Sequence, residues 1–121
     1  MQWFEELPHK CPPDDAQPAN GEYYRIANQD PAQSDDFFSQ RKLQPLKAFQ
    51  GIDECTTMAL FVFDDKQTAL NLLKLPKFRN AHIVKVTLMP TDGMTKKTFG
   101  PHHFSWWRTT QFQPSKAVKI I

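Results

Sequence analysis

The sequence contains few glycines and no long apolar run. The four glycines stand singly, at positions 21, 51, 93 and 100, so no glycine-rich loop that could cradle a phosphate is present. No Gly-x-Ser-x-Gly motif occurs, which excludes a hydrolase built on that nucleophile turn. No stretch approaches the roughly 18 consecutive apolar residues of a membrane-spanning helix. We therefore predict no association with a membrane.

Cysteine is also scarce, because the chain has only Cys11 and Cys55. The segment 1–6 lacks the basic residues and following apolar stretch that characterise a secretory signal. We therefore predict a cytoplasmic protein in which both cysteines remain thiols. Cys55 is expected to be a buried structural thiol, and the alternative is a nucleophile just ahead of a strand.

Acidic residues become rare after Glu54. Residues 1–56 contain five Lys or Arg and ten Asp or Glu, a net charge of −5, whereas residues 57–121 contain ten and three, a net charge of +7. In one interpretation the two halves are adjacent and their charges mix over one surface. In the other, cations of the second half gather into a basic face for an anionic partner. Those cations are Lys74, Lys77, Arg79, Lys96, Lys97 and Arg108.

Large apolar side chains are plentiful, with ten Phe and three Trp among 121 residues. This length and a hydrophobic content of 40% predict one folded domain with a substantial core. Three prolines in residues 9–20 disfavour regular structure there. We therefore divide the chain into an N-terminal arm or loop, residues 1–21, and an α+β domain, residues 22–121.

The clearest pattern lies between Thr57 and Leu88. Residues 58–63 form an apolar run typical of a strand buried on both faces. Asp64 is the predicted N-cap of an amphipathic helix over 65–74, which Pro76 ends. Alternating apolar residues then predict a half-buried strand over 82–88.

The remaining segments add strands and one more helix. Strands are predicted over 22–27, 94–99 and 102–107, with an edge strand in 116–121. Ser34 is the predicted cap of a short helix over 35–42. The fold class is therefore α+β, with a mainly antiparallel sheet and two short helices in a single compact domain.

Reactive side chains concentrate around two adjacent histidines. On a strand His102 and His103 point to opposite faces, so they do not share one metal ion, and we predict neither a metal nor a cofactor. A histidine with a pKa near neutrality can move a proton while an arginine holds a phosphate. The predicted catalytic set is Tyr24, Arg25, His102 and His103.

Two functions are consistent with these residues. The first is a binding module that recognises a protein or other polymer through a partly exposed aromatic and basic face. The second is a small enzyme or toxin that acts on a nucleotide or nucleic acid, with a cleft that joins the strands of Arg25 and His103. The residues of the predicted binding face are Trp106, Trp107, Arg108, Lys96 and Lys97.

Four segments together carry a resemblance. They are Glu22-Tyr-Tyr-Arg25, Ser34-Asp-Asp-Phe-Phe-Ser39, Ala59-Leu-Phe-Val-Phe63 and His102-His-Phe-Ser-Trp-Trp107. Over residues 22–107 the chain resembles a group of small single-domain bacterial proteins, and this resemblance implies a fold without implying an activity.

A fainter similarity is to the ADP-ribosyltransferase fold, in which an early strand carries Arg or His and a later strand carries Ser or an aromatic residue. Arg25 matches the first of these positions, and Ser39 or Thr57 matches the second. Arginine-type members use a glutamate near the last strands, and this chain has no glutamate after Glu54. The similarity therefore implies a related scaffold that lacks this catalytic residue.

Overall fold

The segment after residue 58 folds into the strand, helix and strand that its apolar pattern predicts, in a computed structural model that describes residues 1–121. These elements are β3 (Leu60–Phe63), α3 (Lys66–Leu73) and β4 (His82–Leu88). Leu60 and Val62 are fully buried, and this confirms the predicted buried strand. Removal of these side chains from water is the main gain that stabilises such a core.

Helix α3 begins one residue later than predicted. Asp65, and not Asp64, is the N-cap, and its carboxylate accepts the backbone N–H of Thr68 at 3.0 Å. Asp64 instead bonds to His102. The helix ends before Pro76 as predicted, because Pro cannot continue the ladder of backbone hydrogen bonds.

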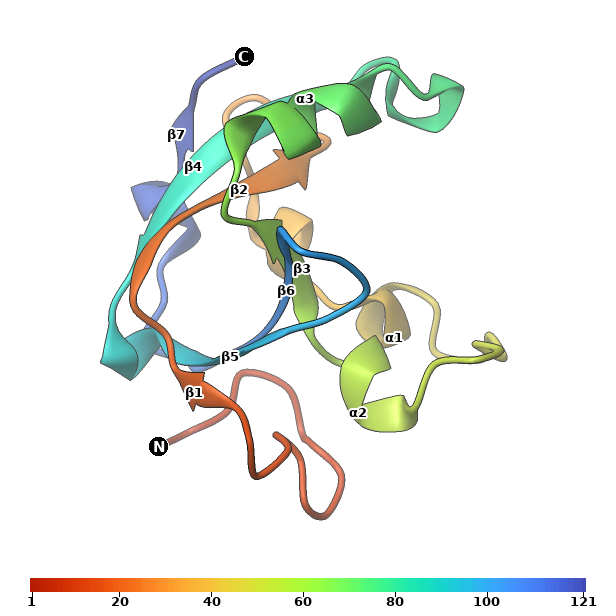
Figure 1. Ribbon diagram of the computed structural model, residues 1–121, viewed down its shortest axis with the longest axis vertical. Coiled ribbons are helices and arrows are strands. Elements are labelled where there is room, and N and C mark those ends of the chain that lie inside the picture. The colour runs from red at the N-terminus through yellow and green to blue at the C-terminus, as the bar shows by residue number, and fades with distance from the viewer.

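Seven strands form one antiparallel sheet in the order β1-β5-β6-β3-β2-β4-β7 (Figure 1). The other strands are β1 (Gln17–Pro18), β2 (Gly21–Ala27), β5 (Gly93–Lys97), β6 (His103–Arg108) and β7 (Val118–Lys119). The predicted strand in 22–27 and the predicted edge strand in the tail are thus confirmed. The predicted α+β fold class is confirmed as well.

The sheet is not continuous between β2 and β3. Strand β2 pairs with β4 along its whole length, from Gly21 to Ala27, but pairs with β3 only where Tyr24 faces Phe63. Strand β3 keeps four paired positions with β6 on its other side. Strands β2 and β3 therefore separate beyond Tyr24, and other groups must satisfy their backbone atoms there.

Alternation along the strands creates apolar clusters on both faces of the sheet. The main cluster includes Tyr23, Val62, Val86 and Trp106, while Trp107 packs in a second cluster with two alanines. A third cluster lies under α3, which Figure 1 shows across β2 and β4. The two adjacent tryptophans therefore lie in different clusters, as alternation along a strand requires.

Two short helical turns replace the single helix predicted over 35–42. A 3-10 turn, η1, covers Ser34–Phe37, and helix α1 covers Gln40–Leu43. The chain is extended at Phe38 and Ser39 between them, and Ser39 rather than Ser34 caps a helix. A further helix, α2 (Glu54–Thr57), was not predicted and lies beside α1 in Figure 1. The other 3-10 turns are η2 (Pro76–Phe78), η3 (Pro90–Asp92) and η4 (Pro114–Lys116).

The N-terminal arm is bound to the rest of the chain. Strand β1 pairs with β5, and Trp3 forms an isolated bridge with Thr109. Cys11 and Cys55 form a disulfide, so the prediction that both remain thiols is wrong. No local pattern in the sequence indicates that the arm returns to α2, where Cys55 lies.

The helices are all short. None of them combines the length and the apolar character that crossing a membrane requires.

Candidate functional site

A pocket of about 710 Å³ opens where β2 and β3 separate. Helix α3, the turn η1, helix α1 and the loop between β5 and β6 complete its walls. Its volume lies within the range of roughly 300–1,000 Å³ that small-molecule sites occupy. The lining residues are Arg25, Ile26, Asn28, Asp35, Asp36, Gln40, Leu43, Phe61, Phe63, Thr68, Asn71, Leu72, Leu75, Lys77, Phe78, Phe99, Gly100, Pro101, His102 and His103.

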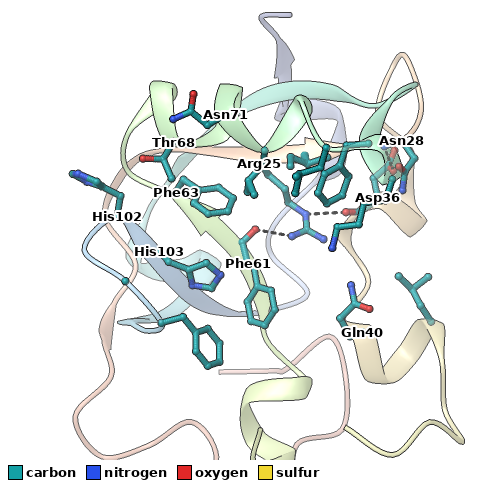
Figure 2. A pocket seen from close by; sticks show the side chains of 18 of the residues that line it. Arg25, Asn28, Asp36, Gln40, Phe61, Phe63, Thr68, Asn71, His102 and His103 are labelled. Carbon is teal, nitrogen blue, oxygen red and sulfur yellow. Dashed lines mark hydrogen bonds between the residues drawn. The ribbon is translucent and has the colours of Figure 1, made fainter. Parts of the chain in front are cut away.

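The side chain of Arg25 spans the gap between the separated strands. Its Nε donates to the carbonyl oxygen of Asp36 at 2.9 Å, and its Nη1 donates to the carbonyl oxygen of Phe61 at 2.8 Å (Figure 2). Arg25 thus replaces strand pairing that β3 loses at Phe61. Nη2 has no hydrogen-bond partner within the protein, so both N–H groups of this nitrogen stay free on the fixed guanidinium.

Arg25 carries its charge at neutral pH without a carboxylate in direct contact. Burial lowers its pKa to about 10, against the opposing effect of Asp36. The carboxylate oxygens of Asp36 accept the backbone N–H groups of Asn28 and Gln33 at 2.8 and 2.9 Å. Asp36 therefore organises the loop around η1, and the guanidinium of Arg25 remains available to a ligand.

His103 lies among aromatic rings on the opposite wall. Its ring centroid is 4.8 Å from that of Phe61 and 5.2 Å from those of Phe63 and Phe99. Nδ1 lies 3.1 Å from the hydroxyl of Thr98, and Nε2 has no partner within the protein. Burial lowers the pKa of His103 below its ordinary value, because a charged ring is poorly solvated there. Burial therefore favours the neutral form of this imidazole.

His102 occupies the rim of the pocket. Its Nδ1 lies 2.8 Å from a carboxylate oxygen of Asp64, and the side chain is half exposed. Figure 2 shows the ring of His102 directed away from Arg25, whereas His103 lies between the loop and β3. Of the two histidines, His103 is the one placed inside the pocket.

The structure brings three of the four predicted catalytic residues to one pocket. Arg25, His102 and His103 all line it, and the predicted cleft between their strands is present. Tyr24 is not part of the lining and packs instead against the cluster under α3. Alternation along β2 separates Tyr24 from its neighbour Arg25.

The predicted aromatic and basic face is wrong for its three central residues. Trp106, Trp107 and Arg108 are 0%, 1% and 7% exposed. The guanidinium of Arg108 lies 3.7 Å from the ring centroid of Phe4 and donates to the carbonyl oxygens of Phe37 and Phe112. These interactions are structural, and they tie the N-terminal arm to the core.

The two lysines of the predicted face have no exposed tryptophan beside them. Lys96 forms an ion pair with Asp15 at 3.2 Å. Lys97 is exposed, and its ammonium lies 5.9 Å from the ring centroid of Phe104. The tryptophans that should complete the face lie in the core because aromatic side chains gain most from full burial.

Sequence reasoning missed several pocket residues. Phe61 was assigned only to the core, and Phe99 was regarded as the end of a strand. For Phe99 the sequence does contain an indication. Gly100-Pro101 follows it and is typical of a loop, and a loop can expose an aromatic ring. Ser39 and Thr57, which matched the second position of the transferase fold, are buried and lie outside the pocket lining.

No group of three or more His, Cys, Asp or Glu side chains is arranged to hold a metal ion. Comparison with protein-family models, with curated proteins and with solved structures found no match to this chain. The interpretation of the pocket therefore depends on its own geometry.

Proposed function

We propose that the protein is a small nucleotide-binding enzyme whose pocket holds a phosphate at Arg25. The single observation that carries this proposal is the half-buried guanidinium with a free Nη2 donor in a pocket of ligand size. A charge-assisted hydrogen bond to a phosphate is about twice as strong as a neutral one. It is stronger still where water is largely excluded.

The arrangement of Arg25 supports a binding role beyond its structural one. Two carbonyl oxygens hold the guanidinium before any ligand arrives, so little conformational freedom is lost on binding. Lys77 also lines the pocket and adds a second cation. The two nearby carboxylates, Asp35 and Asp36, already accept hydrogen bonds from Gln29 and from backbone amides.

His103 supports an enzymatic role. A neutral imidazole with a free Nε2 can accept or donate a proton, and a pKa lowered by burial is typical of catalytic groups. The similarity to the ADP-ribosyltransferase fold remains part of this proposal only as a nucleotide-binding scaffold. The pocket contains no glutamate, so we do not propose transfer through that residue.

Calorimetric titration with nucleoside mono-, di- and triphosphates and dinucleotides tests the proposal. We compare the wild type with Arg25→Met and Arg25→Lys, and use Lys97→Met as a matched control that removes one exposed cation outside the pocket. Loss of a charged hydrogen bond predicts about tenfold to hundredfold weaker binding for Arg25→Met. Arg25→Lys should lose less, and Lys97→Met should bind normally.

Two results would reject this function. One is the absence of binding by any phosphate-containing ligand at millimolar concentration. The other is equal binding by the wild type and a folded Arg25→Met variant. Weaker binding by Lys97→Met would instead favour the basic face predicted from the sequence.

The cytoplasmic location and a protein or polymer partner stay predictions. A disulfide is typical of oxidising compartments, which favours the opposite location. Alkylation of the protein directly on cell lysis, followed by mass spectrometry, distinguishes the two. Direct labelling of Cys11 and Cys55 indicates a reducing compartment, and labelling only after reduction indicates an oxidising one.

A further inference from the structure

We infer that the loop between β5 and β6 provides the seat for a planar heteroaromatic base, which stacks on Phe99 while Arg25 holds the phosphate. This inference rests on the proposed function and assigns the ligand class as nucleoside monophosphate. The base would lie against the aromatic wall of the pocket, which Phe61, Phe99 and His103 form. The stability of the fold does not require an exposed ring in this wall.

Phe99 is an unusual residue to find at this position. Its side chain lines the pocket and is 64% exposed, whereas the other nine phenylalanines of the chain are buried or half-buried. Its backbone has φ of 62°, in the left-handed region that favours glycine and disfavours residues with a Cβ. A loop selected only for stability would place Gly or Asn here. The stability of the loop therefore does not account for a phenylalanine at position 99, and a role in ligand binding does.

The ring of Phe99 is held in place, although it is exposed. It forms near-perpendicular contacts with Phe61, at a centroid distance of 5.8 Å and 85°, and with His103, at 5.2 Å and 75°. Such edge-to-face pairs are favourable and fix the orientation of the rings. The exposed surface of Phe99 is thus an ordered aromatic platform, and ordered aromatic rings are what protein sites use to stack nucleobases.

Phe61 joins the aromatic wall to the cationic anchor. Its ring contacts Phe99 and His103, while its carbonyl oxygen accepts the hydrogen bond from Arg25. The two subsites therefore adjoin the same residue, one at its ring and the other at its carbonyl oxygen. A ligand that fills both must carry a planar ring and a phosphate on a short linker, as the ribose of a nucleoside monophosphate provides.

Three kinds of probe separate the two subsites in a calorimetric titration. AMP, GMP, CMP and UMP carry both groups, the corresponding nucleosides carry only the base and sugar, and ribose 5-phosphate carries no base. Base stacking on an aromatic side chain predicts that at least one nucleotide binds ten times or more tightly than ribose 5-phosphate.

Variants of Phe99 test the platform directly. Phe99→Leu keeps an apolar side chain but removes the ring, whereas Phe99→Tyr keeps the ring. We expect Phe99→Leu to lower the affinity for the preferred nucleotide about tenfold and to leave that for ribose 5-phosphate unchanged. Phe99→Tyr should bind as the wild type does. Met89→Ala is the matched control, because Met89 is exposed and lies outside the pocket.

A second readout is the proton chemical shift of the bound base, which ring currents of Phe99 should move upfield in the wild type and not in Phe99→Leu. Equal binding of nucleotides and ribose 5-phosphate, or an unchanged preference in Phe99→Leu, would overturn the inference while leaving phosphate binding at Arg25 intact. Binding of nucleosides with no contribution from Arg25 would support the base seat and reject the proposed phosphate site.

Discussion

Removal of the disulfide should cost the protein a large part of its stability. Cys11 and Cys55 are separated by 44 positions in the chain. In the chain-entropy description, a crosslink that closes a loop of this length lowers the entropy of the unfolded chain enough to stabilise the fold by about 4 kcal/mol. For 121 residues the corresponding loss of thermal stability is about 15 °C.

The assay is urea unfolding followed by tryptophan fluorescence, comparing the oxidised wild type with Cys11→Ala/Cys55→Ala. Trp107 is a suitable reporter, because its Nε1 donates to the carbonyl oxygen of Cys55 at 2.8 Å. We expect the midpoint to fall by an amount equivalent to about 4 kcal/mol. The reduced wild type is the control, and it should unfold like the double variant.

The same variant should still bind ligand when folded. Other contacts hold the arm, among them the backbone N–H of Phe4 that donates to the carbonyl oxygen of Arg108 at 3.2 Å, and Glu5, which accepts the backbone N–H of Ser39 at 2.9 Å. Neither cysteine lines the pocket. A loss of less than about 1 kcal/mol in the free energy of unfolding would refute this prediction. The entropic gain from a crosslink over this loop length would then be cancelled by another effect of the disulfide.

Three further predictions concern a strand pair, a helix cap and a half-buried histidine. A Cβ on Gly93, whose φ is 136°, would lie 2.0 Å from the carbonyl oxygen of Trp107, so Gly93→Ala should lower the free energy of unfolding by more than about 3 kcal/mol in urea titrations. Asp65→Ala should cost about 1 kcal/mol and Asp64→Ala much less, a contrast that thermal unfolding measures and that equal losses would contradict. The pKa of His103 is lowered, so the unfolded chain takes up a proton below pH 6.5 that the folded ring does not. Stability should therefore fall as the pH drops from 6.5 to the folded pKa and then level off, and His103→Gln should lack this fall; NMR titration of the ring should give a midpoint below 6.5.

The elements with strong local signals were predictable from the sequence. The apolar run of β3 and the alternation of β4 identify them without tertiary information, because a strand buried on both faces requires the first pattern and a half-buried strand the second. The prediction of one helix over 35–42 was wrong because of a contact with a distant part of the chain. Ser39 is fully buried and binds Glu5, 34 positions away, which stabilises an extended chain where local propensity favoured a helix.

The candidate site was predictable in its residue types but not in its surroundings. An arginine can bind a phosphate and a histidine can transfer a proton, and Arg25 and His103 were both predicted on these grounds. The aromatic face failed because Trp106, Trp107 and Arg108 are as suitable for a core as for a surface, and composition does not distinguish the two. Burial of Arg108 also required acceptors from η1 and from the chain after β6, which no local pattern reveals.

The separation of β2 from β3 is the feature that joins fold and site. A continuous sheet would pair the backbone of Phe61 with β2 and leave no space between the strands. Here Arg25 supplies the missing donor to Phe61 from its side chain, and this substitution both satisfies the strand and places a fixed cation at the bottom of an open pocket. The same arginine completes the hydrogen bonding of the sheet and forms the proposed anion site. Arg25→Lys should separate the two roles, because it keeps the charge but loses the paired contacts with Asp36 and Phe61.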